Sequence, residues 1–312
     1  MSTRGSAWRE VWQRQVRRAE DLGYATVLIP DHVWTPMAPI AALAIAAEAT
    51  TTLRLGTLVF GNDFRHPVIL AKEAATLDVF SGGRLELGLG SGWQLSDYET
   101  LGIPFDPPGV RISRFAEAVQ ILRGSFVQDP FSFSGDHYSV SNFRLLPKPI
   151  QRAGPPILIG GGSRRILSIA GRYADIVGLN HRATAAGDID ASDITAEGTT
   201  QKVAWVREAA GERFREVELS VMISTLAVTA GDRGAAASSL LEARGLADKL
   251  TVDQLLGAPQ ALVGSISQIV ETLQSRREQF GISYIVVREA DEGSEISAME
   301  SFAPVVARLA GK

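Results

Sequence analysis

The residue of this 312-residue chain best placed for proton chemistry is His32, which follows the short apolar run Ala25–Pro30 and Asp31. Histidine titrates near neutral pH, so it can give or take a proton in a reaction. A lone histidine is more often structural, but a position just after a strand favours a catalytic role. Trp34, two residues further on, suits either the wall of a ring-binding pocket or ordinary core packing.

Glycines and a serine follow the apolar run Arg84–Leu89. Glycine alternates with other residues over positions 88 to 92, but a dinucleotide-binding G-x-G-x-x-G pattern would need glycine where Trp93 stands. Glycine near the end of a strand lets a flat ligand or a neighbouring backbone approach closely. We therefore expect the hydroxyl of Ser91 to hydrogen-bond the edge of a cofactor.

A run of glycines with a hydroxyl and two cations follows the apolar run Pro156–Gly160 and opens a helix. Backbone N–H groups at a helix start attract anions, and phosphate sites recur in such loops of α/β barrels. The pattern predicts a turn that binds a phosphate group; an ordinary turn with a serine N-cap is the alternative. The turn consists of Gly161, Gly162, Ser163 and Arg164.

Four polar residues follow the apolar run Leu53–Phe60. Asn62 and Asp63 suit the capping of the next helix, which begins near a proline. Arg65 and His66 could reach a ligand, but a role at the helix start fits them at least as well.

Composition and absent motifs exclude several classes of protein. The chain has no cysteine, which excludes disulfides, thiolate zinc sites and cysteine nucleophiles. Its four histidines have no metal-binding spacing, so no metal is expected, and a net charge of −4 argues against a nucleic-acid partner. No apolar run reaches the roughly 18 residues of a membrane span, and the polar start is unlike a signal peptide. We expect a cytoplasmic protein.

Short apolar runs alternate with amphipathic stretches, which predicts an α/β fold with a parallel sheet in a single domain over residues 1–312. The runs are rich in Val, Ile and Leu, as is typical of strands covered on both faces. The expected helices span Ala7–Leu22, Ala38–Ala49, Pro67–Phe80, Arg111–Leu122, Ser163–Tyr173, Ser265–Phe280 and Ala298–Leu309. The seven expected strands are Ala25–Pro30, Leu53–Phe60, Arg84–Leu89, Pro156–Gly160, Asp175–Leu179, Glu218–Thr225 and Ser283–Val287.

Seven strands are one short of a closed (β/α)8 TIM barrel, and the strand that is missing is the first. The barrel is then open or completed by another segment or subunit, or the chain begins differently from its relatives. Two segments depart from the βα alternation. We expect residues 92–154 to form an active-site insertion and residues 181–200 to form a flexible flap, since long loops in compact domains are often functional.

Several blocks of the sequence resemble the bacterial luciferase-like family, and within it the branch that uses the deazaflavin coenzyme F420. The similarity runs in the expected order through much of the first 180 residues and returns near the end. The blocks are RRAEDLGYATVLIPDH, the stretch from LRLGTLVFGNDF to LELGLGSGW, the stretch from FSGDHYSV to PPILIGGG, AGRYADIVGL and VGSISQIVETLQSRREQFGISYIVV.

The resemblance implies a luciferase-like TIM barrel and specific roles for residues. Asp31 and His32 match a strand-end pair, of which the histidine lies in the active site. The second expected strand would carry a non-prolyl cis peptide behind the cofactor ring, near Leu58-Val59. The loop beside the ring corresponds to Ser91, Gly92 and Trp93, and the phosphate turn to Gly161, Gly162 and Ser163.

The leading functional hypothesis is an F420-dependent oxidoreductase that transfers a hydride, with His32 handling the matching proton. The first alternative is an FMN-dependent monooxygenase supplied by a reductase partner, and the second is a non-catalytic flavin-binding protein. Relatives indicate a homodimer. Aromatic residues such as Trp34 and Tyr138 suit an apolar or ring-shaped small-molecule substrate, and both are predicted to line its pocket.

Overall fold

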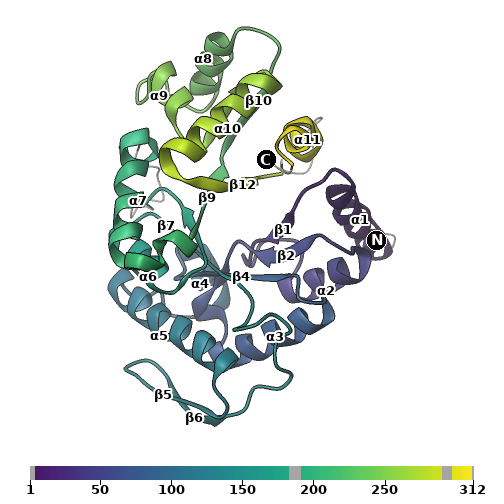
Figure 1. Cartoon of the computed structure of the whole chain (residues 1–312), viewed down its shortest axis with the longest axis vertical. Coiled ribbons are helices and arrows are strands. Elements are labelled where there is room, and N and C mark those ends of the chain that lie inside the picture. Colours follow the sequence, from purple (N-terminus) through teal and green to yellow (C-terminus); the bar gives the residue numbers. More distant parts are fainter. Residues whose placement is uncertain (1–3, 183–190, 290–296, 311–312) are drawn as a thin grey trace. The chain divides into compact units, whose positions relative to one another are not determined.

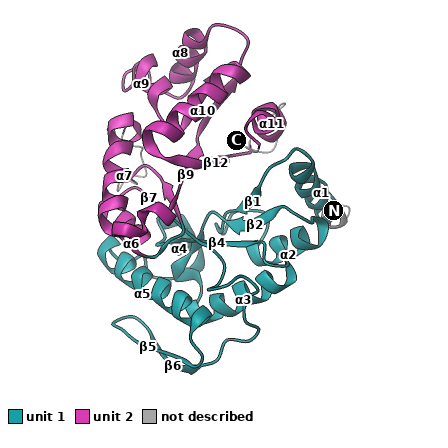
Figure 2. Cartoon of the chain, in the orientation of Figure 1, with its two compact units in different colours: residues 1–160, 173–175 teal, residues 161–172, 176–312 magenta. Residues whose placement is uncertain are grey.

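The computed structural model describes residues 4–182, 191–289 and 297–310 (Figure 1). The chain divides into two compact units, shown in different colours in Figure 2. Unit 1 comprises residues 1–160 and 173–175, and unit 2 comprises residues 161–172 and 176–312. Each unit contains parallel strands and the helices that cover them. The expectation of one domain over the whole chain stays a prediction.

Unit 1 contains four parallel strands in the order β1-β2-β4-β7, with the short β3 paired to β4. An antiparallel hairpin, β5–β6, follows the longest helix of the unit. The elements are α1 (Arg4–Asp21), β1 (Thr26–Ile29), α2 (Pro39–Ala49), β2 (Arg54–Thr57), β3 (Phe60–Gly61), the 3-10 helix Asn62–Phe64, α3 (Pro67–Phe80), β4 (Leu85–Gly90), α4 (Leu95–Leu101), α5 (Pro108–Val127), β5 (Phe131–Ser134), β6 (Ser139–Phe143) and β7 (Ile157–Gly161), whose last residue belongs to unit 2.

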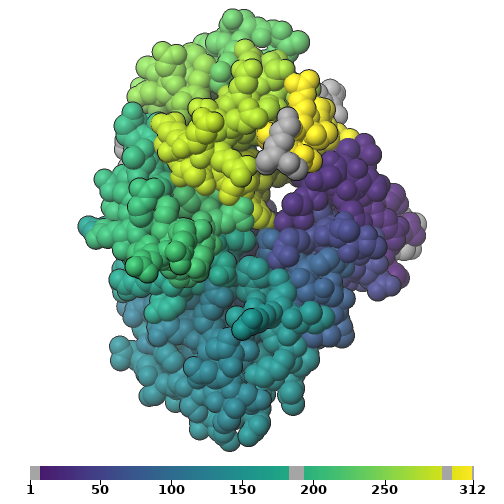
Figure 3. Space-filling view, viewed as in Figure 1, coloured from purple at the N-terminus to yellow at the C-terminus, as the bar shows by residue number. Residues whose placement is uncertain are grey.

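The core of unit 1 lies between the parallel strands and helices α2, α3 and α5. All six residues of β4 are buried, as expected of a strand with another element on each face. Both α2 and α3 begin with a proline, whose fixed backbone angle suits the first turn of a helix. Helix α3 packs against α5. Figure 3 shows the surface of the chain in the colours of Figure 1.

Unit 2 contains the parallel strands β8, β9 and β12, and a separate parallel pair, β10–β11, that packs with α8 and α9 around a small apolar cluster. The elements are α6 (Arg164–Tyr173), β8 (Ile176–Leu179), the 3-10 helix Ala191–Ile194, α7 (Ala196–Ala210), the 3-10 helix Gly211–Glu216, β9 (Glu218–Ile223), β10 (Thr225–Val228), α8 (Arg233–Ala243), α9 (Val252–Gly257), β11 (Ala261–Gly264), α10 (Ile266–Phe280), β12 (Ile282–Val287) and α11 (Ala298–Leu309).

The expected α/β architecture is confirmed, and all seven expected strands are present with ends shifted by one or two residues. Two of them divide: the run Leu53–Phe60 becomes β2 and β3, and the run Glu218–Thr225 becomes β9 and the start of β10. A capping box of Ser265 and Gln268 is formed at the start of α10. Strand β11 and the hairpin were not expected, because both are too short for a clear period-two pattern.

The segment 92–154 is not one long loop. It contains α4, the 20-residue helix α5 and the β5–β6 hairpin, so most of it is regular structure. Of the expected flap, residues 183–190 lie outside the described residues, and residues from Ala196 onward belong to α7. In the part of the chain that the structure describes, α1 is the first element and no helix is long and apolar enough to cross a membrane.

Candidate functional site

The side chain of His32 lies just beyond the carboxyl end of β1 and is held by a buried carboxylate. Its Nδ1 is 2.6 Å from Oδ2 of Asp97, whose side chain is 3% exposed. The other oxygen of Asp97 accepts a hydrogen bond of 3.2 Å from the backbone N–H of Val33. Within the described residues the second ring nitrogen of His32, Nε2, has no hydrogen-bond partner. The ring is therefore oriented and keeps one nitrogen available for a ligand.

Two exposed tryptophans flank this imidazole. Trp34 stacks on His32 with ring centroids 5.1 Å apart and planes 14° apart. Trp93 meets the same ring edge-on, at 5.7 Å and 89°. The tryptophans are 62% and 56% exposed, which is unusual for the largest apolar side chains and typical of a binding surface. We call His32, Trp34 and Trp93 the aromatic corner.

Ser91 and Gly92 lie in the loop after β4, directly before Trp93. Among the described residues the hydroxyl of Ser91 has no hydrogen-bond partner, and the residue is partly exposed. Gly92 has a φ of 75°, and a Cβ there would lie 1.9 Å from Oη of Tyr98. Gly92 is therefore required by the close approach of Tyr98. Cofactor binding by both residues stays a prediction.

The predicted non-prolyl cis peptide is present between Leu58 and Val59, where β2 ends. Two glycines of the neighbouring strand β4 make room for this segment. A Cβ on Gly88 would lie 1.8 Å from the carbonyl oxygen of Thr57, and a Cβ on Gly90 would lie 2.5 Å from Cγ2 of Val59. Of the two reasons expected for glycine at this strand end, close approach of the neighbouring segment is the one that the structure shows.

The carboxylate of Asp31, predicted to bind the cofactor, is occupied by protein contacts. It forms a two-point ion pair with Arg65, at 2.8 and 3.1 Å, and accepts a hydrogen bond of 3.1 Å from the backbone N–H of Gly61. The guanidinium of Arg65 also lies over the ring of Phe60. Asp31 thus fastens the segment after the cis peptide to the end of β1, and a direct contact with a cofactor stays a prediction.

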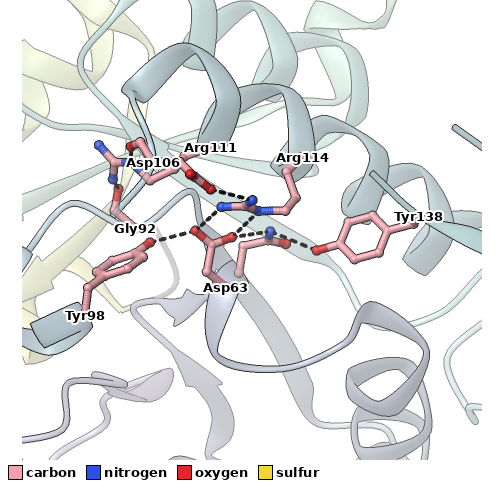
Figure 4. Close-up of polar contacts among 8 residues, drawn as sticks. Asp63, Gly92, Tyr98, Asp106, Arg111, Arg114 and Tyr138 are labelled. Carbon is pink, nitrogen blue, oxygen red and sulfur yellow. Dashed lines mark hydrogen bonds and ion pairs between the residues drawn. The ribbon is translucent and has the colours of Figure 1, made fainter. Parts of the chain in front are cut away.

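A second polar cluster, the Asp63 network, joins the 3-10 helix after β3 to α4 and α5 (Figure 4). Asp63 receives two hydrogen bonds from Arg114, at 2.8 and 2.9 Å, and one of 2.8 Å from the hydroxyl of Tyr98. Arg114 also pairs with Asp106 at 2.8 Å. The network consists of Asn62, Asp63, Tyr98, Asp106, Arg111 and Arg114.

The guanidinium of Arg111 is the most buried cation of this network, with the residue 6% exposed. It donates to the backbone carbonyls of Gly92 and Asp106 and lies 4.0 Å from the ring centroid of Phe105. These contacts hold the loop after β4 against the start of α5.

Titration in the network follows from burial and charge. Burial opposes ionisation of Asp63, but hydrogen bonds from Arg114 and Tyr98 together with the charge of Arg114 outweigh it, so the pKa of Asp63 lies below its ordinary value. Burial and the neighbouring carboxylate of Asp63 raise the pKa of Tyr98 well above its usual range. Asp63 is therefore ionised and Tyr98 neutral across the physiological range, as a structural anchor requires.

Tyr138, predicted to line a substrate pocket, lies at the edge of the Asp63 network opposite Gly92 (Figure 4). Its hydroxyl is 3.4 Å from Nδ2 of Asn62, and its ring packs edge-on against His66 at 5.3 Å. Burial raises the pKa of Tyr138. Its described contacts are with this network and the hairpin core, and none is with the aromatic corner. His66 caps α3 and accepts a hydrogen bond from the backbone N–H of Val68. Of the two roles considered for His66, ligand binding or a role at the helix start, the structure shows the role at the helix start.

The predicted phosphate turn belongs to unit 2. A Cβ on Gly161 would lie 2.2 Å from Cγ2 of Ile166, and one on Gly162 would lie 2.4 Å from the backbone of His181. Arg164 is exposed and pairs with Glu208 at 3.0 Å. The hydroxyl of Ser163 is 3.5 Å from the N–H of Ile166, at the limit of a hydrogen bond, so the serine is available to a ligand. Phosphate binding stays a prediction.

The residues that hold the site together have no distinctive motif in the sequence. Asp97 is 65 positions from His32, and Arg114 is 51 positions from Asp63. The one local signal for Asp97 is its place in the first turn of a helix, where acidic residues are common for reasons of helix polarity alone. Searched over the described residues, the structure contains no group of His, Asp and Glu that could hold a metal ion.

Comparison with known proteins decides the family. The model of the luciferase-like monooxygenases matches residues 1–278. The chain belongs to the luciferase-like monooxygenase family. The fold agrees: the structure of an F420-dependent secondary alcohol dehydrogenase in complex with an F420-acetone adduct superposes with a TM-score of 0.72 at 18% identity, covering 95% of this chain and 94% of that one.

Relatives within the luciferase-like family differ in cofactor. The FMNH2-dependent dimethylsulfone monooxygenase of Pseudomonas putida is 39% identical over 109 residues, which are 35% of this chain and 30% of that protein. The F420-dependent glucose-6-phosphate dehydrogenase of Amycolatopsis mediterranei is 31% identical over 166 residues, 51% of this chain and 49% of that protein. The chain thus spans well under two thirds of the length of either relative.

Proposed function

We propose that this luciferase-like protein is an F420-dependent oxidoreductase that transfers a hydride between the deazaflavin and a small organic substrate, with His32 giving or taking the matching proton. The observation that supports the proposal is the aromatic corner. Its imidazole is half-buried and oriented by a carboxylate, and its Nε2 has no protein partner in the described structure. A proton-transfer group that is oriented but unoccupied is what acid–base catalysis needs.

The residues of unit 1 fit a flat heterocyclic cofactor. Trp34 and Trp93 present exposed aromatic faces, which suit contact with rings, and Ser91 offers a hydroxyl without a described partner. When bound, the cofactor would supply the hydride chemistry, while the protein supplies binding, orientation and exclusion of water.

Hydride transfer removes one hydrogen with both electrons of its bond, so the reaction leaves one proton, and His32 is proposed to take or give that proton. In the oxidising direction Nε2 of His32 would take up the O–H proton of an alcohol substrate as its carbonyl forms, and a bound oxidised cofactor would accept the hydride from the C–H bond that breaks. In the reducing direction every transfer reverses. The step uses one hydride and one proton and needs no oxidant besides the cofactor.

A second candidate is an FMN-dependent monooxygenase, favoured by the identity of 39% with the P. putida enzyme over 109 residues. That activity would require reduced flavin from a partner reductase and would consume oxygen. Deazaflavin forms no productive oxygen adduct, so dependence of the reaction on oxygen separates the two candidates.

Further parts of the proposal concern binding and assembly. The Gly161–Arg164 turn of unit 2 is proposed to bind a phosphate group, and its test is the loss of phosphate affinity in the variant Ser163→Ala. The partners proposed for the chain are a small-molecule substrate and a second copy in a cytoplasmic homodimer, without nucleic acid or membrane.

The test of the main proposal is a titration of the purified chain with F420 and, separately, with FMN, followed by cofactor fluorescence. We expect saturable, selective binding of F420, and turnover of alcohols or ketones without oxygen. Selective binding of FMN with oxygen-dependent turnover would establish the second candidate instead. Binding of neither cofactor would contradict both and favour a non-catalytic role.

A further inference from the structure

We propose that Asp97 is a positioning residue: it keeps the proton of the neutral His32 imidazole on Nδ1, so that Nε2 is the nitrogen that exchanges a proton with the substrate. The inference rests on the proposed function in assigning proton transfer to His32. The tautomer itself follows from geometry and can be tested without any substrate.

The contact between His32 and Asp97 is short and buried. At 2.6 Å, the distance between Nδ1 of His32 and Oδ2 of Asp97 is that of a short, charge-assisted hydrogen bond. An ionised carboxylate can only accept, so the hydrogen between the two atoms must belong to Nδ1. Because Asp97 is 3% exposed, water does not compete for this contact.

The carboxylate of Asp97 is itself anchored to the backbone beside His32. Oδ1 of Asp97 accepts from the backbone N–H of Val33, the residue next to His32. The following turn is closed by Thr35, whose N–H and hydroxyl both donate to the backbone carbonyl of His32, at 3.1 and 2.6 Å. One carboxylate thus holds both the ring and the backbone of the turn, so its two oxygens have fixed and different partners.

Among the described residues, no other ionisable side chain forms a hydrogen bond or ion pair with His32. The neighbouring Asp31 has both oxygens engaged by Arg65, and the two rings that contact His32 are the uncharged Trp34 and Trp93. Asp97 is therefore the charged group that faces the imidazole, and the tautomer depends on it.

Because of this arrangement, the variant Asp97→Asn tests the tautomer of His32 directly. The backbone N–H of Val33 needs an acceptor, so the amide oxygen takes the place of Oδ1 and the amide nitrogen faces Nδ1 of His32. Nδ1 must then accept, and the proton moves to Nε2. The variant keeps the shape of the side chain and both hydrogen bonds while reversing the tautomer, as replacing the carboxylate by an amide does in the serine-protease triad.

The experiment is NMR of the full chain labelled with nitrogen-15 in histidine, recorded where the histidines are neutral. The chain has four histidines, and His32→Gln identifies the signals of His32. We expect Nδ1 to carry the proton in the wild type and Nε2 to carry it in Asp97→Asn. The matched control is Glu99→Gln, the same chemical change at an exposed position of α4, which should leave the signals unchanged.

Kinetics then connect the tautomer to catalysis. In assays with F420 and a substrate that the wild type converts, Asp97→Asn should lower kcat by about 100-fold or more and leave KM unchanged. This decrease is the usual contribution of a positioned acid–base group to the rate. A purely structural role would instead move KM, cofactor affinity and unfolding together. Wild-type enzyme with the proton on Nε2, an unchanged tautomer in the variant, or a reversed tautomer with unchanged kcat would each overturn the proposal.

The experiments distinguish a wrong oxidoreductase assignment from a wrong role for Asp97. If the wild type binds neither cofactor and turns over no substrate, the oxidoreductase assignment is wrong, while the NMR spectra still decide whether Asp97 sets the tautomer of His32. If turnover is normal and the tautomer is not as expected, the oxidoreductase assignment stands and the role of Asp97 is wrong.

Discussion

The aromatic corner and the Asp63 network lie in the same unit and share one helix, yet they are built on opposite rules. Asp97 and Tyr98 are neighbours in the first turns of α4; the first holds His32 and the second holds Asp63. Consecutive residues of a helix point about 100° apart, so one helix start can serve two regions. In the corner Nε2 of His32 has no partner among the described residues, whereas in the network both carboxylate oxygens of Asp63 are hydrogen-bonded.

The difference teaches how to separate chemistry from support. Buried charges that are fully paired are costly to disturb and do not need a ligand, which identifies the network as a scaffold. The aromatic corner has exposed aromatic faces around Nε2 of His32, which has no partner among the described residues. Altering these faces should change the stability of the fold little, but the faces are suited to contact with a ligand. Changes in the corner should therefore reduce activity, and changes in the network should reduce stability.

The largest expected effect is on turnover. His32→Ala should lower kcat by about 10² to 10⁴-fold because it removes the proton-transfer group, while F420 affinity stays unchanged. Steady-state kinetics and a fluorescence titration on the same preparation measure the two effects. The matched control is His137→Ala, whose side chain has no described contact; equal losses of turnover and binding in His32→Ala would argue against an acid–base role.

The next effect is on stability. Asp63→Asn should lower the free energy of unfolding by about 3 kcal/mol, since it leaves the buried contacts of Arg114 and Tyr98 uncompensated. Urea denaturation gives this value. Asp106→Asn, which removes a more exposed ion pair with the same arginine, should cost about 1 kcal/mol or less. Equal costs for the two variants would show that the network is not centred on Asp63.

The depressed pKa of Asp63 gives a pH dependence. A carboxyl whose pKa is lower in the folded state than in the unfolded state stabilises the fold above the unfolded value, about pH 4, and this contribution is lost as the pH falls through the lower folded-state pKa. Unfolding free energies measured downward from pH 5 should therefore decline less steeply in Asp63→Asn than in the wild type. Parallel curves would assign the acid sensitivity to other groups.

The smallest expected effect is the stability change on altering the corner. Trp34→Ala should shift the free energy of unfolding by no more than about 0.5 kcal/mol because the side chain is 62% exposed, while KM for the substrate rises. Phe115→Ala, at a position 1% exposed, should cost about 3 to 5 kcal/mol in the same assay. A large loss of stability in Trp34→Ala would make that tryptophan part of the core.

Much of the framework was predictable because its signals are local. The β-rich run before His32 and the helix from Ser265 to Phe280 each follow from adjacent residues, and both are found where expected. The cis peptide at Leu58-Val59 was predicted from family resemblance and is present. Within the segment 92–154 the helix Arg111–Leu122 was predicted and is found as part of the longer α5, whereas α4 and the β5–β6 hairpin were not predicted.

The partners of the site were not predictable in the same way. Nothing in the residues near Asp97 indicates that its carboxylate meets a histidine 65 positions earlier. The glycines of β4 were equally ambiguous: a sequence shows that space is needed at Gly88, but not that the carbonyl of Thr57 fills it.

The sequence by itself determined the order of strands and helices, the strand ends where functional residues stand, and the family. Those features depend on local propensity, periodicity and motif. The tertiary structure alone decided that Asp97 orients His32, that Asp31 is bound by Arg65, and that Tyr138 joins the Asp63 network. Hydrogen bonds across long stretches of chain are fixed by the register of strands and the angles of helices, which no short segment of sequence contains.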